Sequence, residues 1–74
     1  MVVSHINPQG EVIPLRFTWR GATYEITSWG RRWTAIDGEH SLVMAATGRM
    51  FELVYRPQDG DWYLKGASPA QSAV

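Results

Sequence analysis

The clearest structural pattern in this chain lies in Phe17-Thr18-Trp19-Arg20-Gly21-Ala22-Thr23-Tyr24-Glu25-Ile26. On both sides of Arg20-Gly21, apolar side chains alternate with polar ones, and a period of two is typical of a strand with one buried face. Glycine adopts positive φ angles without steric cost, as a tight antiparallel turn requires. The stretch therefore predicts a β hairpin with an arginine at its tip.

The same two signals, alternation and glycine turns, recur along the chain, whereas helical spacing is nowhere sustained. The turns are Arg20-Gly21, Asp37-Gly38, Thr47-Gly48 and Asp59-Gly60. They separate five strand-like runs: Ile13–Trp19, Thr23–Ile36, Ser41–Ala46, Met50–Arg56 and Trp62–Lys65. The second run is too long for one flat strand, and Gly30 within it predicts a bulge or sharp bend between Trp29 and Trp33.

The connections are too short for crossovers, so neighbouring strands should pair antiparallel. Short twisted strands with one apolar face curl so that this face is hidden. We therefore predict an all-β domain over residues 11–66, a five-stranded antiparallel meander that forms an SH3-like half-open barrel. Residues 1–10 lack a strand pattern and are expected to be a flexible N-terminal segment. Residues 67–74 are small and polar and are expected to be a disordered tail.

Length and composition limit the classes of protein to which the chain can belong. Its 74 residues make one domain whose core must come from a few large side chains, and the chain supplies four Trp, three Tyr and two Phe. It has no cysteine, so disulfides and thiolate metal sites are excluded. Its first residues do not resemble a signal peptide and no apolar run could span a membrane, so we expect a cytoplasmic protein.

Charge is balanced overall but unevenly distributed. The net charge is zero, yet residues 11–36 hold four arginines against two glutamates, and residues 37–61 hold five acids against two arginines. A dedicated duplex-DNA binder usually has a clear basic excess. The chain therefore does not resemble such a binder, although its arginines share their segment with three tryptophans.

These arginines and tryptophans form the candidate binding surface. Bases of single-stranded nucleic acid stack on aromatic rings while arginines hold the phosphate backbone. The alternative is a purely structural role for Trp19 in the core, because it shares a strand face with Leu15 and Phe17. The bend at Gly30 can turn Trp29 or Trp33 outward. The predicted surface comprises Trp19, Arg20, Trp29, Arg31, Arg32 and Trp33.

Signs of catalysis or metal binding are weak. The acids Asp37, Glu39, Asp59 and Asp61 lie in or beside glycine turns, where Asp stabilises the turn by bonding its own backbone. Two histidines, His5 and His40, have no metal-ligand spacing. No serine lies in a nucleophile elbow, and no phosphate-binding loop or HExxH pattern occurs. We expect a protein that is not an enzyme and has no metal or cofactor.

Four motifs of structural glycines and aromatics lie within about residues 14–65. They are Phe17-x-Trp19-Arg20-Gly21-x-x-Tyr24-x-Ile26, Arg32-Trp33, Gly48-x-x-Phe51-Glu52-Leu53-x-Tyr55 and Trp62-x-Leu64. Together they resemble a small bacterial domain of unknown function that is associated with translesion (Y-family) DNA polymerases. Between Tyr24 and Trp33 the chain departs from the family, whose members have a more basic, apolar segment there. The resemblance implies no catalytic residue and an accessory role near DNA repair.

Two functions follow as expectations. The first is a non-enzymatic binding module, a DNA-repair accessory that contacts single-stranded nucleic acid or a DNA polymerase through the candidate surface. The second is a protein-interaction or structural module that pairs through an exposed strand edge with a host protein or with itself as a homodimer. A concentration-dependent dimer without salt-sensitive affinity for oligonucleotides would indicate the second.

Overall fold

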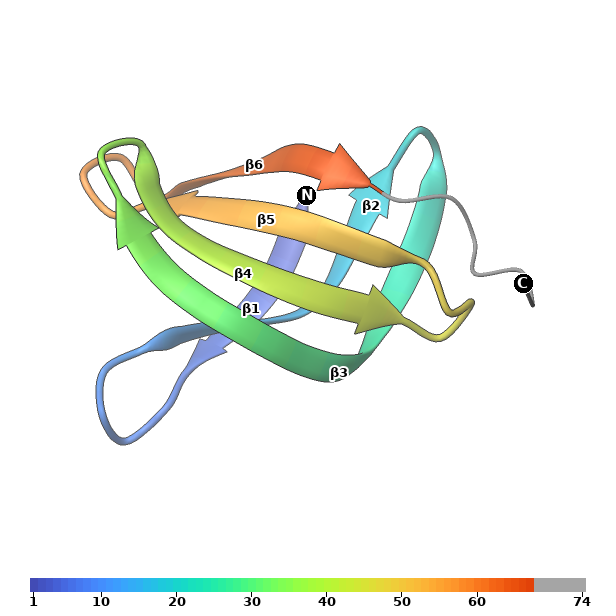
Figure 1. The fold of residues 1–74 in the computed structure, drawn as a ribbon, viewed down its shortest axis with the longest axis horizontal. Coiled ribbons are helices and arrows are strands. Elements are labelled where there is room, and N and C mark those ends of the chain that lie inside the picture. Colours follow the sequence, from blue (N-terminus) through green and yellow to red (C-terminus); the bar gives the residue numbers. More distant parts are fainter. Residues whose placement is uncertain (68–74) are drawn as a thin grey trace.

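The computed structural model describes residues 1–67 and forms an all-β half-barrel (Figure 1). Six strands follow one another in a single antiparallel sheet, each paired with its neighbours in the chain. Figure 1 shows this sheet curling on itself, and the described residues contain no helix. The strands are β1 (Val2–Ile6), β2 (Val12–Trp19), β3 (Ala22–Ala35), β4 (Gly38–Ala45), β5 (Met50–Arg56) and β6 (Asp61–Ala67).

The prediction of five strands is wrong by one, because residues 1–10 contain a strand. β1 pairs antiparallel with β2, from Val2 opposite Phe17 to Ile6 opposite Val12. A turn joins the two strands. The Asn7 carboxamide oxygen accepts hydrogen bonds from the backbone amides of Gln9 (3.0 Å) and Glu11 (2.9 Å). The segment expected to be flexible is therefore a hairpin arm, whereas the predicted tail beyond Ala67 lies outside the described residues.

The glycine turns are confirmed. Gly21, Gly38, Gly48 and Gly60 all have positive φ angles at the ends of strands. Gly38 has a second constraint, because a Cβ there would come within 2.4 Å of the Tyr55 carbonyl oxygen. The β3–β4 turn can therefore lie this close to β5 only with glycine at that position.

β3 is shared by both halves of the sheet. Its first residues, Ala22–Glu25, pair with β2, and from Ile26 onward its partner is β4. The register shifts twice, between Ile26 and Ser28 and between Trp29 and Arg32, so the bulge predicted at Gly30 is confirmed. Bulges increase strand twist and bending. β3 therefore changes direction and brings the two halves of the sheet face to face.

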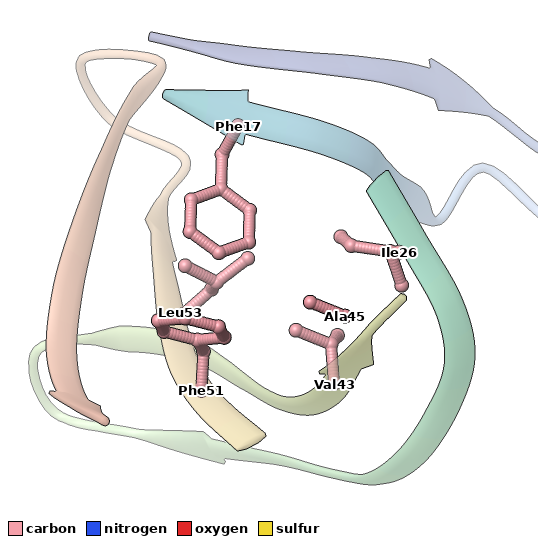
Figure 2. Packing of buried hydrophobic residues seen from close by; sticks show 6 residues of the cluster. All are labelled: Phe17, Ile26, Val43, Ala45, Phe51 and Leu53. Carbon is pink, nitrogen blue, oxygen red and sulfur yellow. The ribbon is translucent and has the colours of Figure 1, made fainter. Parts of the chain in front are cut away.

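The core lies in the concavity that this bend creates (Figure 2). Phe51 on β5 is 1% exposed, and its ring is 4.8 Å from Phe17, 5.7 Å from Trp19 and 5.0 Å from Tyr24, measured between centroids. Such tilted and edge-to-face contacts add to the hydrophobic stabilisation. The buried cluster comprises Phe17, Ile26, Val43, Ala45, Phe51 and Leu53.

Alternation predicted the buried face well except at Leu15 and at Val54, which is buried although it alternates with Phe51 and Leu53. Phe17, Ile26, Phe51 and Leu53 are buried as expected, but Leu15 is only half-buried. The cause is a bulge in β2. Val3 lies opposite Arg16 and Ser4 opposite Pro14, so Leu15 is the extra residue and the alternation shifts by one.

Replacing Phe51 by Ala should lower the free energy of unfolding by about 3–5 kcal/mol, because it removes the ring that the other core aromatics contact. Urea unfolding followed by tryptophan fluorescence measures this. Ile36→Ala is the control, since that side chain is fully exposed in the β3–β4 turn and its loss should change stability by less than about 0.5 kcal/mol. Equal unfolding midpoints for the two variants would contradict the assigned core.

Candidate functional site

The six residues of the predicted surface do not lie together. Trp19 and Arg20 are at the β2–β3 turn, Trp29 is at the bend of β3, and the other three follow it toward the β3–β4 turn. In a meander these two turns lie at opposite ends of the sheet, as Figure 1 shows. The candidate surface therefore divides into separate groups, each of which has its own surroundings.

Trp19 is a half-buried residue that packs against the core cluster. The guanidinium carbon of Arg20 lies 4.6 Å from its ring centroid and that of Arg49 lies 5.0 Å from it. Arginines this close to an indole ring make cation–π contacts. Trp19 therefore supports the core and holds two cations at one end of the sheet.

Arg20 has an unusual backbone conformation. Its φ angle is +51° and that of Gly21 is +77°, so the two-residue turn has positive φ at both positions. Hairpin turns of this type favour Asn-Gly or Gly-Gly, because a longer side chain is strained in the left-handed region. Arg20 therefore combines a strained backbone with a guanidinium that lies over the Trp19 ring.

Trp29 is 44% exposed, as the bend at Gly30 allows, but its indole is not free. The Nε1–H group donates a hydrogen bond of 2.7 Å to the carbonyl oxygen of Pro14. Pro14 lies on β2 beyond the point where β2 and β3 stop pairing. Trp29 therefore connects the two diverging strands and leaves only part of its surface to a ligand.

The arginines differ in how far they are neutralised. Arg32 lies 3.2 Å from a Glu11 carboxylate oxygen and 4.0 Å from one of Glu39. Arg16 lies 4.0 Å from Glu25. Within residues 1–67, Arg20 and Arg31 form no salt bridge. Arg20 is thus better placed than Arg32 to bind a phosphate. Arg32 borders a cavity of 310 Å³ together with both of its acidic partners, Glu11 and Glu39.

Trp33 belongs to a network around a buried histidine. The imidazole of His40 is 3% exposed and stacks on Trp33 with ring centroids 5.0 Å apart. Its Nδ1 is 2.6 Å from a Glu52 carboxylate oxygen and its Nε2 is 2.6 Å from one of Asp37. Lys65 on β6 donates a further hydrogen bond of 3.1 Å to Asp37. The network connects the β3–β4 turn with β4, β5 and β6.

The network shifts two pKa values. Hydrogen bonds to Asp37 and then Glu52 raise the pKa of His40 above 6.5, and burial opposes this rise. The hydrogen bond with His40, followed by that from Lys65, lowers the pKa of Asp37 to about 2. Two carboxylates facing the two ring nitrogens suit a protonated imidazole, which donates from both nitrogens. The sequence showed only an Asp-Gly turn and an isolated histidine, with no signal for this contact.

An apolar opening lies between the two edge strands of the sheet. β1 and β6 are the outermost strands, and a cavity of 190 Å³ lies between residues of β1 and β2 on one side and of β5 and β6 on the other. None of the described residues that line it has a charged side chain. We call this opening the seam; its apolar walls are Val2, Phe17, Trp19, Leu53, Trp62 and Leu64.

Sequence reasoning missed the seam because it missed β1. A signal was present: Val2, Val3 and Ile6 are β-branched, and Asn7-Pro8-Gln9-Gly10 combines residues that favour turns. Together with the run Ile13–Trp19, this segment predicts a hairpin. The edge of the sheet is then formed by residues 2–6 and not by the run Ile13–Trp19. Figure 2 shows Phe17 on β2 and Leu53 on β5 pointing toward each other at the interior.

Residues 1–67 lack two further features. No group of three or more histidine, cysteine or acidic side chains in these residues could hold a metal ion. The described part of the chain also has no helix that could cross a membrane. No protein family model, curated protein or solved structure matches the chain.

The His40 network predicts how stability depends on pH. A raised folded pKa gives stability that is complete below about 6.5 and is lost as the pH rises through the folded value, at most about 1.4 kcal/mol per pH unit. At pH values above about 6, urea titrations should show this loss for the wild type and a flat profile for His40→Gln. His5→Gln, at an exposed position, should keep the wild-type profile. A His40→Gln variant with the same alkaline loss as the wild type would contradict the assignment.

Proposed function

We propose that this chain is a non-enzymatic interaction module that accepts an extended protein segment in the seam of an SH3-like half-barrel. The seam supports this, because apolar side chains that would be covered in a closed barrel border an opening there. The strands on either side, β1 and β6, each have an outer edge that no described strand pairs with. Such an edge gives a peptide main-chain hydrogen bonds, and an adjacent pocket gives side-chain specificity.

The size of the cavity favours a side chain over a small-molecule ligand. Small-molecule sites usually have volumes of about 300–1,000 Å³. An engineered apolar cavity of about 150 Å³ holds a benzene molecule. The seam cavity of 190 Å³ is close to the second value and suits one large apolar side chain. The resemblance to a polymerase-associated domain makes a translesion DNA polymerase the first host protein to test.

Short random peptides selected for binding should have apolar residues at alternate positions. Leu64→Lys should weaken their binding by about tenfold or more, since it places a charge in the seam and removes an apolar contact. Fluorescence titration through Trp62, which also lines the seam, measures the affinity. Leu42→Lys is the matched control, since Leu42 is half-buried outside the seam and its loss should leave binding unchanged. Both variants must first show cooperative unfolding. Peptides that bind Leu64→Lys as tightly as the wild type would contradict the proposal.

Arg20 favours a second function, contact with single-stranded nucleic acid at the β2–β3 turn. Its backbone is strained, and its guanidinium lies over the Trp19 ring, as does that of Arg49. Few cations take part, so affinity should be weak and each phosphate contact should contribute about −0.7 to the slope of log affinity against log salt.

Arg20→Ala should therefore flatten this salt slope by about 0.7 for a short oligonucleotide. Arg32→Ala should leave the slope unchanged, because Glu11 and Glu39 already neutralise that guanidinium. Fluorescence titration at several salt concentrations separates the two variants. Equal slopes for wild type and Arg20→Ala, or no binding at low salt, would exclude nucleic-acid contact at this turn.

A further inference from the structure

β1 has an unshielded free edge. It is the first strand of the sheet, and no described strand pairs with its outer side. Native edge strands are usually protected from pairing by lysine or other charges, by proline or by a bulge. The five residues of β1, Val-Val-Ser-His-Ile, include no Lys, Arg, Asp, Glu or Pro, and the bulge in the β1–β2 ladder places its extra residue on β2. The edge therefore remains competent to pair.

The hydrogen bonds to β2 determine which backbone groups face outward. The backbone N–H of Asn7 donates to the backbone carbonyl of Glu11 (2.9 Å), and that of Thr18 donates to the backbone carbonyl of Met1 (2.8 Å). Antiparallel ladders alternate hydrogen-bonded and non-hydrogen-bonded pairs. Between Met1 and Asn7, both bonded to β2, the even-numbered residues must therefore direct their N–H and C=O groups to the free edge. These residues are Val2, Ser4 and Ile6.

We propose that a second copy of this chain pairs with β1, antiparallel and about a two-fold axis at Ser4. In this register Ser4 pairs with Ser4, and Val2 pairs with Ile6 in both directions, so every outward backbone group of β1 is bonded. A shift by two residues in either direction leaves a terminal residue of each strand unpaired. An interface in which the same patch serves both copies is the form that a two-fold dimer requires.

The register also supplies an occupant for the seam, and to this extent the inference rests on the proposed function. Val2 packs against the core and lines the seam, whereas Ile6 is 70% exposed. Residues two apart on a strand share a face, so Ile6 lies on the face of Val2. Pairing Val2 with Ile6 of the second copy therefore sets that exposed side chain beside the cavity. Each copy closes the seam of the other.

Sedimentation equilibrium of the full chain tests the dimer. The interface is small, so the dissociation constant of the wild type should be on the order of 10–100 μM. Ile6→Lys should raise it at least tenfold, because it adds a charge to the edge and removes the side chain that enters the seam. Ile36→Lys makes the same change at a fully exposed isoleucine away from β1 and should leave the constant unchanged. A wild type that stays monomeric at several hundred micromolar, or equal effects of the two substitutions, would overturn the inference.

Cross-linking tests the register. Opposed residues in a hydrogen-bonded antiparallel pair have Cα atoms about 5.5 Å apart, within the range that a disulfide can bridge. The chain has no cysteine of its own. Mild oxidation of Ser4→Cys should therefore give a covalent dimer much faster than oxidation of Gln9→Cys, which lies in the exposed β1–β2 turn. Equal rates would overturn the Ser4-centred pairing.

The dimer and the seam function can fail separately. If the wild type is monomeric but selected peptides bind and Leu64→Lys weakens them, the seam function stands and the second copy is the wrong occupant. If the wild type dimerises through β1 and no peptide binds Ile6→Lys, the dimer stands and the seam accepts no other segment. If both inferences hold, peptides should bind Ile6→Lys more tightly than the wild type, because the competing second copy is gone.

Discussion

The double role of β3 determines the shape of this molecule. The strand pairs with β2 over its first residues and with β4 over the rest, and two register shifts between Ile26 and Arg32 bend it in between. A flat sheet of this sequence would leave its apolar face in water. The bend brings β2 over β5, so that Phe17 and Phe51 meet in the interior. Gly30 lies at the second register shift, and a glycine inside a strand often marks a bulge of this kind.

The barrel is open between its outermost strands. Among the described residues β1 and β6 are not paired with each other, and Phe17 and Leu53 border an apolar cavity there. A polar network joins four of the structural elements. The contacts among His40, Asp37, Glu52 and Lys65 hold the β3–β4 turn against β4, β5 and β6. The molecule thus has both an apolar seam and a hydrogen-bonded polar network.

The sequence predicted those features that local physics determines. Alternation identified Phe17, Ile26, Phe51 and Leu53 as buried, and the glycine turns marked the boundaries between strands. The features it missed depend on partners distant in sequence. Whether Arg32 is available to a phosphate depends on Glu11, which only the β1–β2 hairpin brings near. Likewise, the surroundings of His40 come from a turn and a neighbouring strand, and no spacing in the sequence indicates them.

Backbone amide exchange followed by NMR shows whether β1 has an open edge beside an open seam. At a concentration where the chain is monomeric, the amides of Val3 and His5 should be protected by β2, whereas those of Ser4 and Ile6 should exchange as quickly as exposed loop amides. Raising the concentration should protect Ser4 and Ile6 alone among these four. Protection of all four amides in the monomer would show instead that the barrel is closed and that β1 has no free edge.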